Sequence, residues 1–217
     1  MRSHPLESRY IAIEGVIGVG KTSLARLLAR DTGGRLHLEV VDENPFLPRF
    51  YAEPRRYAFQ TQIFFLLSRF RQQQELHQQD LFGTPVFSDY IFAKDRIFAN
   101  VTLDDEELRL YERLAAELEP RVPVPDLVVY LQASVDVLMA RIAQRGRAYE
   151  VQISRSYIEE LNEAYNHFFF HYGDSPLLVV NTSGMDFVGN PEHYEVLRRN
   201  FAEPFQGVRY YTPAWER

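Results

Sequence analysis

Residues 15–22 of this chain read Gly15-Val16-Ile17-Gly18-Val19-Gly20-Lys21-Thr22. This stretch fits the pattern G-x-x-x-x-G-K-[ST] at every position, which is the signature of a phosphate-binding loop. Residues 10–14 before it are strand-like, and residues 21–30 after it are helix-like. A glycine-rich turn that only caps a helix is the alternative, but chance rarely supplies the Lys-Thr pair and both flanking elements. The sequence therefore predicts a site for phosphate groups.

Each part of this loop has its own task. The glycines let backbone N–H groups converge on phosphate oxygens, and the N-terminus of the following helix adds partial positive charge. We expect Lys21 to reach the β- and γ-phosphates and the hydroxyl of Thr22 to bind Mg²⁺. Ser23, the next residue of the helix, is also expected to contact ATP.

Composition narrows the classes of partner. The chain has 217 residues, of which 24 are basic and 30 acidic, so its formal net charge is −6. This balance argues against a nucleic acid polymer, which favours a basic surface. There are no cysteines, which excludes disulfides and thiolate metal sites. No stretch approaches the roughly 20 apolar residues of a membrane span. We expect a cytoplasmic protein without a membrane partner, with a loose tail at residues 1–9 and a single domain at residues 10–217.

The alternation of short β-branched runs with helical stretches indicates the fold class. It predicts an α/β protein with a five-stranded parallel sheet covered by helices on both faces, as in the three-layer fold of P-loop kinases. The expected strands are residues 10–14, 36–41, 85–89, 126–132 and 177–181. The expected helices are residues 21–30, 57–79, 92–100, 104–118, 134–145, 154–172 and 191–201.

Two helices are more apolar than a surface helix needs to be. The stripe in the 57–79 helix consists of Phe59, Ile63, Leu66, Leu67 and Phe70, widened by Phe64 and Phe65. A stripe this wide needs more cover than one sheet face gives. The run Phe168-Phe169-Phe170 raises the same question. Burial in the core and contact with a second subunit both remain open, and we expect a homodimer.

Carboxylates follow two of the expected strands. In open α/β sheets, ligands bind beyond the carboxyl ends of the strands. Asp42 and Glu43 follow the second strand, and Asp89 follows the third. A carboxylate there suits a hydroxyl acceptor, because it can orient the hydroxyl and accept its proton, whereas it would repel a phosphate. Capping of the Asn44-Pro45 turn is the alternative for Glu43. Asp89 is expected to bind Mg²⁺, or else to cap the next helix.

A cluster of arginines lies late in the chain, at Arg141, Arg145 and Arg147. Arg141 and Arg145 are one helical turn apart and share a face. Gly146 is expected to end that helix and begin a mobile lid, which would place positive charge over the transferred phosphoryl group and exclude water. A solvated helix end is the alternative. The sequence contains no N-K-x-D motif, which counts against a GTPase, and His167 and His171 lack the acidic residue of a metal pattern.

From about residue 10 to residue 187, these segments follow one another as they do in a known family. The chain resembles the deoxyribonucleoside kinases, in particular the bacterial deoxyadenosine/deoxyguanosine kinases. The resemblance rests on four features: the phosphate-binding loop, Glu43, the helix that begins near Phe59, and the arginines of residues 141–147.

The resemblance implies a role for each further residue of the site. Glu43 falls on the carboxylate that accepts the proton of the sugar 5′-hydroxyl. Tyr51 and Glu150 fall on the pair that holds the 3′-hydroxyl. Arg141, Arg145 and Arg147 fall on the lid. The remaining matches are Gln62, Arg69 and Asp95, which fall on base-contacting residues, and Asp186 and Phe187, which lie against the adenine of ATP.

One segment departs from the family pattern. The family carries an acidic residue followed by Arg and Ser after the third strand, whereas this chain reads Asp89-Tyr90-Ile91. Tyr90 therefore stands where an arginine is expected to orient the 5′-hydroxyl and the phosphate. Lys94, one helical turn further, is the candidate to supply the missing charge and to contact the substrate.

The resemblance implies an ATP- and Mg²⁺-dependent kinase that phosphorylates the 5′-hydroxyl of a deoxyribonucleoside in nucleoside salvage. Deoxyadenosine and deoxyguanosine are favoured equally. Two alternatives stay open on the sequence alone. One is a nucleoside monophosphate kinase of the thymidylate kinase type, which should offer arginines to the acceptor. The other is a non-catalytic nucleotide-binding switch, which would have no use for sugar-reading residues.

Overall fold

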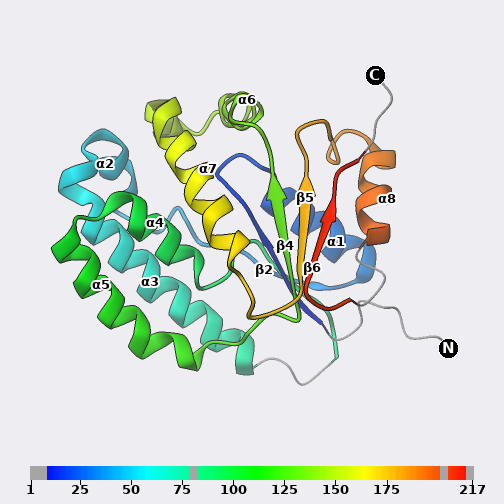
Figure 1. Ribbon diagram of the computed structural model, residues 1–217, viewed down its shortest axis with the longest axis horizontal. Helices are drawn as coiled ribbons and strands as arrows, with labels where there is room; N and C mark the ends of the chain where they lie inside the picture. Colours follow the sequence, from blue (N-terminus) through cyan, green and yellow to red (C-terminus); the bar gives the residue numbers. More distant parts are fainter. Residues whose placement is uncertain (1–8, 79–82, 201–204, 214–217) are drawn as a thin grey trace.

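Six parallel strands form the centre of the computed structural model, which describes residues 9–78, 83–200 and 205–213 (Figure 1). Their order across the sheet is β2-β3-β1-β4-β5-β6. Strand β1, which leads into the phosphate-binding loop, is central and pairs in parallel with β3 and β4. The strands are β1 (Tyr10–Glu14), β2 (Arg35–His37), β3 (Val86–Ser88), β4 (Leu127–Gln132), β5 (Leu177–Asn181) and β6 (Val208–Tyr211).

The sheet confirms the predicted α/β class but corrects two strands. The predicted count of five omitted β6, which pairs with β5 at the edge of the sheet. Its side chains alternate between exposed and half-buried, so it lacks the continuous apolar run of a central strand. Strand β2 has only three residues and ends at His37, four residues earlier than the expected strand 36–41. This early end moves the residues that follow β2 relative to the site.

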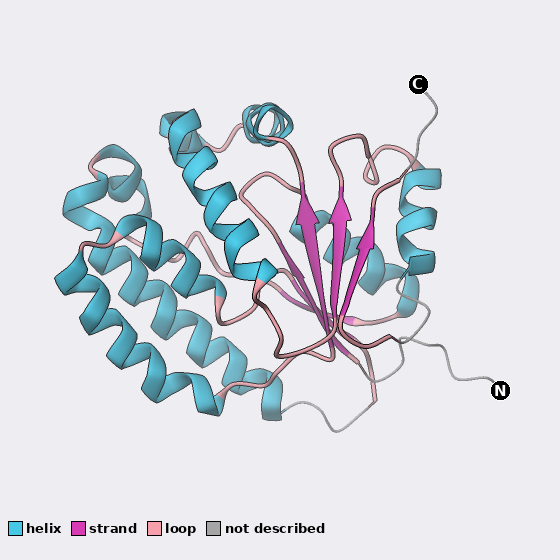
Figure 2. Ribbon diagram, viewed as in Figure 1, coloured by secondary structure: helices cyan, strands magenta, loops and turns pink. Residues whose placement is uncertain are grey.

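Helices flank the strands, with α3, α4, α5 and α7 to one side and α1 and α8 to the other (Figures 1 and 2). Each expected helix is present with shifted ends, and the six-residue α2 was missed because it is too short to show a helical period. The last expected residues of the 57–79 and 191–201 helices lie outside the described residues. The helices are α1 (Lys21–Thr32), α2 (Leu47–Ala52), α3 (Pro54–Gln78), α4 (Lys94–Thr102), α5 (Asp105–Leu118), α6 (Val135–Arg145), α7 (Arg155–Phe170) and α8 (Pro191–Asn200), with short 3₁₀ helices η2 (Glu119–Arg121) and η3 (Ala148–Gln152).

Local sequence explains where several helices begin and end. Asp104 and Glu107 form a capping box at the start of α5. Ser134 and Ser154 cap α6 and α7 with their hydroxyls. Gly146 ends α6 in the left-handed conformation, as expected for the start of the lid.

The core lies on both faces of the sheet. Strands β1, β4 and β5 are almost wholly buried, which explains their continuous runs of Val, Ile and Leu. The carboxyl ends of β1, β2 and β3 meet at one edge, where the phosphate-binding loop begins. No helix in the described ranges is long and apolar enough to span a bilayer.

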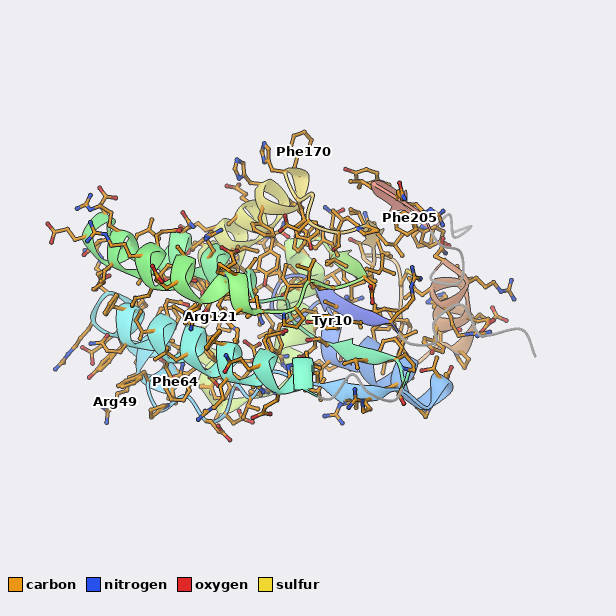
Figure 3. The ribbon with its side chains drawn as sticks, turned by 90° about the horizontal axis from the view of Figure 1, so that it is seen from below. Tyr10, Arg49, Phe64, Arg121, Phe170 and Phe205 are labelled. Atoms are coloured by element: carbon orange, nitrogen blue, oxygen red, sulfur yellow. The ribbon has the colours of Figure 1, made fainter. Side chains whose placement is uncertain are left out.

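The two apolar helices divide their side chains between core and surface. In α3, Phe65 and Leu66 are buried, whereas Leu67 is 54% exposed. In α7, Phe169 is buried, whereas Phe170 is 77% exposed and projects from the surface (Figure 3). Core packing therefore explains part of each stripe, and contact with a second subunit stays a prediction for the rest.

Candidate active site

The phosphate-binding loop has the backbone that its glycines require. Gly15, Gly18 and Gly20 have φ angles of 144°, 88° and 106°. A Cβ atom on Gly15 would lie 2.4 Å from the carbonyl oxygen of Leu131, so a larger residue would clash with β4. Gly20 is the N-cap of α1 and no side chain caps the helix there. The N–H groups of the first turn are therefore available for an anion.

Lys21 is held inside the loop. Its Nζ donates to the carbonyl oxygens of Gly15 and Val16, at 2.7 and 3.2 Å. Burial, with the neighbouring positive charge of Lys94, lowers the pKa of the Lys21 ammonium to about 8. A phosphate that approaches the loop would relieve both effects, because it supplies negative charge and hydrogen-bond acceptors.

Thr22 and Asp89 lie together at the carboxyl ends of β1 and β3. The Thr22 hydroxyl donates to Asp89 Oδ2 at 2.5 Å, and the other carboxylate oxygen accepts the backbone N–H of Glu39 at 2.8 Å. A hydroxyl and a carboxylate are the hard oxygen ligands that Mg²⁺ takes alongside water and substrate phosphates. The described residues hold no group of three or more acidic, histidine or cysteine side chains suited to a metal. Thr22 and Asp89 would leave the other coordination positions to water and phosphate oxygens, so this pair fits a cation shared with a nucleotide.

Glu39 is the carboxylate that reaches the interior beyond β2. Its Oε2 accepts from Lys94 Nζ at 2.5 Å, and its Oε1 accepts from the guanidinium of Arg69, with Nε at 2.9 Å. Arg69 also pairs with the buried Asp95. Burial by itself raises the pKa of the Glu39 carboxyl, but Arg69 and Lys94 outweigh it and hold the pKa well below its usual range. Glu39 is therefore ionised at neutral pH.

Glu43, the expected proton acceptor, does not lie in this position. Its side chain is exposed and is not among the residues that line the cavity, whereas Glu39 lines it. The cause is the early end of β2 at His37, which makes Glu39 the second residue after the strand. The turn at Asn44 is closed instead by Asn44 itself, whose Oδ1 accepts the N–H of Phe46 at 3.0 Å.

Tyr90 stands at the position of the family's arginine but does not have its role. It is fully buried, and its hydroxyl lies 2.8 Å from His37 Nε2 and donates to Gln72 at 3.3 Å. Burial lowers the pKa of His37 to about 4. Lys94 instead brings positive charge to the carboxylate of Glu39, and its role as a substitute for the arginine stays a prediction.

The far end of the cavity is built from α3. Gln62, Thr61 and Phe65 line it, and the guanidinium carbon of Arg69 lies 4.7 Å from the centre of the Phe65 ring. Three buried oxygen atoms in this region have no hydrogen-bond partner within the described part of the chain: Thr61 Oγ1, Gln62 Oε1 and Asp95 Oδ2. Unpaired buried polar atoms are costly, so they indicate a place for polar atoms of a ligand.

The lid closes over the cavity through several contacts. Arg145 forms a two-pronged contact with the buried Glu150, at 2.6 and 3.0 Å. Arg147 donates to the Tyr149 hydroxyl at 2.9 Å, and this hydroxyl donates to Asp42 Oδ1 at 3.2 Å. The ring of Tyr149 lies parallel to that of Tyr51, with centroids 6.0 Å apart. The lid is thereby tied to the segment after β2.

Arg141 has different partners from the other lid arginines. Its guanidinium donates to the carbonyl oxygens of Val19, Thr182 and Met185 and to the Thr182 hydroxyl, at 2.8–3.3 Å. These contacts tie the phosphate-binding loop to the segment after β5. They favour a positioning role for Arg141 rather than the catalytic role expected of it.

Two cavities meet at the phosphate-binding loop. The first, of about 270 Å³, lies between β2, α3, α4 and the lid, and is close to the lower end of small-molecule pockets, at roughly 300 Å³. The second, of about 640 Å³, lies between the loop, α6 and the segment after β5, and includes Ser23, Asp186 and Phe187. Four residues line both cavities: Lys21, Thr22, Arg145 and Arg147. Groups bound in the two cavities would therefore meet near the cations Lys21, Arg145 and Arg147.

Three residues of the site were not identified from the sequence. Glu39 has a signal, since a lone acid interrupts the apolar run Leu38–Val41. Glu14 is buried before the loop and accepts the backbone N–H groups of Gly15 and Ile91, at 3.0 and 2.9 Å. Burial raises the pKa of its carboxyl. Tyr149 has no sequence signal, because its contacts with Tyr51 and Asp42 join segments about a hundred residues apart.

Comparisons with known proteins agree on one family. The family model described as "Deoxynucleoside kinase" matches residues 11–205. The chain is 36% identical to deoxyguanosine kinase of Bacillus subtilis over 199 residues, which cover 89% of this chain and 96% of that protein. It is 32% identical to the deoxyadenosine/deoxycytidine kinase of the same organism, covering 90% and 93%. The structure of deoxyadenosine kinase from M. mycoides with bound dATP superposes with a TM-score of 0.79 at 26% identity, covering 90% of this chain and all of that one.

Proposed function

Because the chain belongs to the deoxynucleoside kinase family, whose members are phosphotransferases with a nucleoside hydroxyl as acceptor, we propose that it transfers the γ-phosphoryl group of ATP to the 5′-hydroxyl of a deoxyribonucleoside, as a step of nucleoside salvage in the cytoplasm. The observation that carries the proposal is the junction of the two cavities at Lys21, Thr22, Arg145 and Arg147. Donor and acceptor bound on either side would meet within reach of three cations.

The larger cavity is the place for ATP. The adenine would lie near Asp186 and Phe187, and the phosphates would lie on the N–H groups of residues 15–22 and the first turn of α1. Thr22 and Asp89 would hold Mg²⁺, which neutralises charge on the phosphates when bound. Lys21 would exchange its two carbonyl contacts for phosphate oxygens.

The smaller cavity is the place for the nucleoside. Its sugar would lie between Tyr51 and the lid residue Glu150, and its base would lie against α3. Glu39 would accept a hydrogen bond from the 5′-hydroxyl and take its proton as the new bond forms. Since the transition state of phosphoryl transfer is loose, the hydroxyl need not lose its proton early, and a weakly basic carboxylate that orients it is sufficient.

Lys94 takes the charge-bearing role of the arginine missing at position 90. It holds one oxygen of Glu39, while Arg69 holds the other. The carboxylate is thereby fixed in direction without losing its charge. A buried acid at this end of the cavity also disfavours a monophosphate acceptor, whose own negative charge it would repel.

A homodimer is part of the proposal. The outer surface of α4 and α7 forms a groove with apolar side chains, among them Ile97, Val101 and Phe168, flanked by Arg96 on one helix and Glu163 on the other. In a dimer with two-fold symmetry, Arg96 of each protomer would face a glutamate at position 163 in the other protomer. Sedimentation should give twice the chain mass of 25.4 kDa, and Val101→Glu should give the single-chain mass. A single-chain mass for the unmodified protein at micromolar concentration would contradict this part of the proposal.

The test of the function is an assay of ADP formation. The protein is incubated with Mg²⁺-ATP and each of four deoxynucleosides, and in parallel with the four deoxynucleoside monophosphates. We expect ADP and a 5′-monophosphate from at least one nucleoside, and no ADP from the monophosphates. Turnover of monophosphates alone would indicate a monophosphate kinase, and ATP binding without any turnover would indicate a switch.

A further inference from the structure

Gln62 presents an unpaired acceptor to the nucleoside cavity. Its side chain lines the cavity and is only 2% exposed, and its Oε1 has no partner within the described residues. The Oγ1 of Thr61, the preceding residue, is also buried and unpaired. A buried amide oxygen is satisfied only by an N–H or O–H donor. The cavity therefore requires a donor from its ligand at this point.

The direction of the Gln62 amide is set by Thr102, the last residue of α4. The Thr102 hydroxyl donates its only hydrogen to the carbonyl oxygen of Phe98, at 2.8 Å. It can then only accept from Gln62, and it does so from Nε2 at 3.1 Å. Oε1 is therefore the atom of the amide that is left without a partner in the described residues. Reversing the amide would require Thr102 to give up its hydrogen bond to Phe98.

The surroundings favour a flat ring as the ligand group. The side chains of Phe65 and Phe98 line the same cavity. Arg69, the cation nearest to Phe65, already pairs with Glu39 and Asp95. An aromatic ring with an N–H group at its edge satisfies both the apolar walls and the unpaired oxygen.

We propose that Thr102 is a positioning residue for base selection: by fixing the Gln62 amide, it makes the enzyme prefer bases with an exocyclic amino group, as in adenine and cytosine, over bases with a carbonyl at the same position. This inference rests on the proposed nucleoside kinase function. A carbonyl facing Oε1 would leave two acceptors unpaired, which costs at least about tenfold in kcat/KM. Thr102 controls this preference through one hydrogen bond, which corresponds to about fivefold in kcat/KM.

The experiment compares deoxyadenosine with deoxyinosine, which differ at position 6 of the purine, and deoxycytidine with deoxyuridine, which differ at position 4 of the pyrimidine. The unmodified protein should favour the amino base of each pair at least about tenfold in kcat/KM. Thr102→Val keeps the shape of the side chain but removes the hydroxyl, so the preference should fall about fivefold, through a higher KM for the amino base. Thr102→Ser should restore the preference.

Thr32→Val is the matched control. Thr32 ends α1 as Thr102 ends α4, and its hydroxyl donates to Leu28 one turn back at 2.8 Å. Leu28 does not line the cavity, whereas Gln62, which contacts Thr102, does. Its substitution removes the same kind of helix contact and should leave the base preference unchanged.

Several outcomes would overturn the inference. One is that the unmodified protein prefers deoxyinosine to deoxyadenosine or does not distinguish them. This result does not depend on whether a variant folds. Another is a Thr102→Val variant with the same base ratio as the unmodified protein. Absence of ADP with every nucleoside would contradict the proposed function itself and is distinguishable from both.

Discussion

The two ends of the active site are built in different ways. The phosphate end is one continuous segment, residues 15–22, and offers mainly backbone N–H groups to an anion. The acceptor end is assembled from side chains of separate elements: Glu39 after β2, Arg69 on α3, Lys94 on α4, and Glu150 in the lid. A backbone site depends on local conformation, whereas a side-chain site depends on where each element ends and what packs beside it.

This difference has a consequence for charge. At the phosphate end, Lys21 donates to two carbonyl oxygens and forms no ion pair within the described residues, so its charge is available to an anion. At the acceptor end, Glu39, Arg69, Lys94 and Asp95 form ion pairs with one another. The first end gains its interactions when ligand binds, whereas the second is already ordered. Substitutions should therefore affect the two ends differently.

The largest effect is expected at the phosphate end. Lys21→Met removes the cation proposed to contact the transferred group, and kcat should fall about 10³-fold, as for other groups that stabilise transition-state charge. KM for the nucleoside should change little, because Lys21 acts on the phosphate side. Steady-state kinetics with both substrates measures this, and a loss confined to nucleoside KM would contradict the division between the two ends.

A smaller effect is expected for Lys94. In Lys94→Met, Glu39 keeps Arg69 but loses its second cation, so kcat/KM should fall roughly 30-fold, and Lys94→Arg should recover part of it. Arg155→Met is the control, since Arg155 is an exposed cation paired with Asp136 and Glu159 outside both cavities. A Lys94→Met variant within about twofold of the unmodified protein would mean that Lys94 does not replace the missing arginine.

The third effect concerns stability rather than catalysis, at the end of β2. His37 has a pKa of about 4 in the folded protein against 6.5 as its ordinary value. Between these values the unfolded chain binds more protons, so folding stability falls as pH is lowered from 6.5 to 4, by at most about 3 kcal/mol from this group. Urea unfolding at pH 6.5 and 4.5 should show a smaller acid loss in His37→Gln. An equal loss in both proteins would show that His37 is not buried in its neutral form.

The same contrast explains what could be predicted from the sequence. The loop, the sheet and most helices follow from local patterns, and so do Asp89 at the end of β3 and Lys94 one turn beyond the departure at Tyr90. Glu39 could not be found by counting from a strand whose end was placed four residues too late.

The lid arginines show a second limit. Spacing correctly places Arg141 and Arg145 on one face of α6, but spacing does not reveal their partners. Arg141 meets carbonyl oxygens of the loop and of the segment after β5, whereas Arg145 meets the carboxylate of Glu150. Tertiary neighbours, and not position on the helix, decide which of them is free to act on a phosphate.

Comparison of Glu39→Gln with Glu43→Gln tests whether Glu39 holds the acceptor hydroxyl at the junction of the two cavities. Both remove one carboxylate from the segment after β2 and keep its size. We expect Glu39→Gln to lower kcat at least about 10²-fold while the protein still binds nucleoside, and Glu43→Gln to stay within twofold of the unmodified protein. A large loss in Glu43→Gln with near-normal turnover in Glu39→Gln would contradict the account.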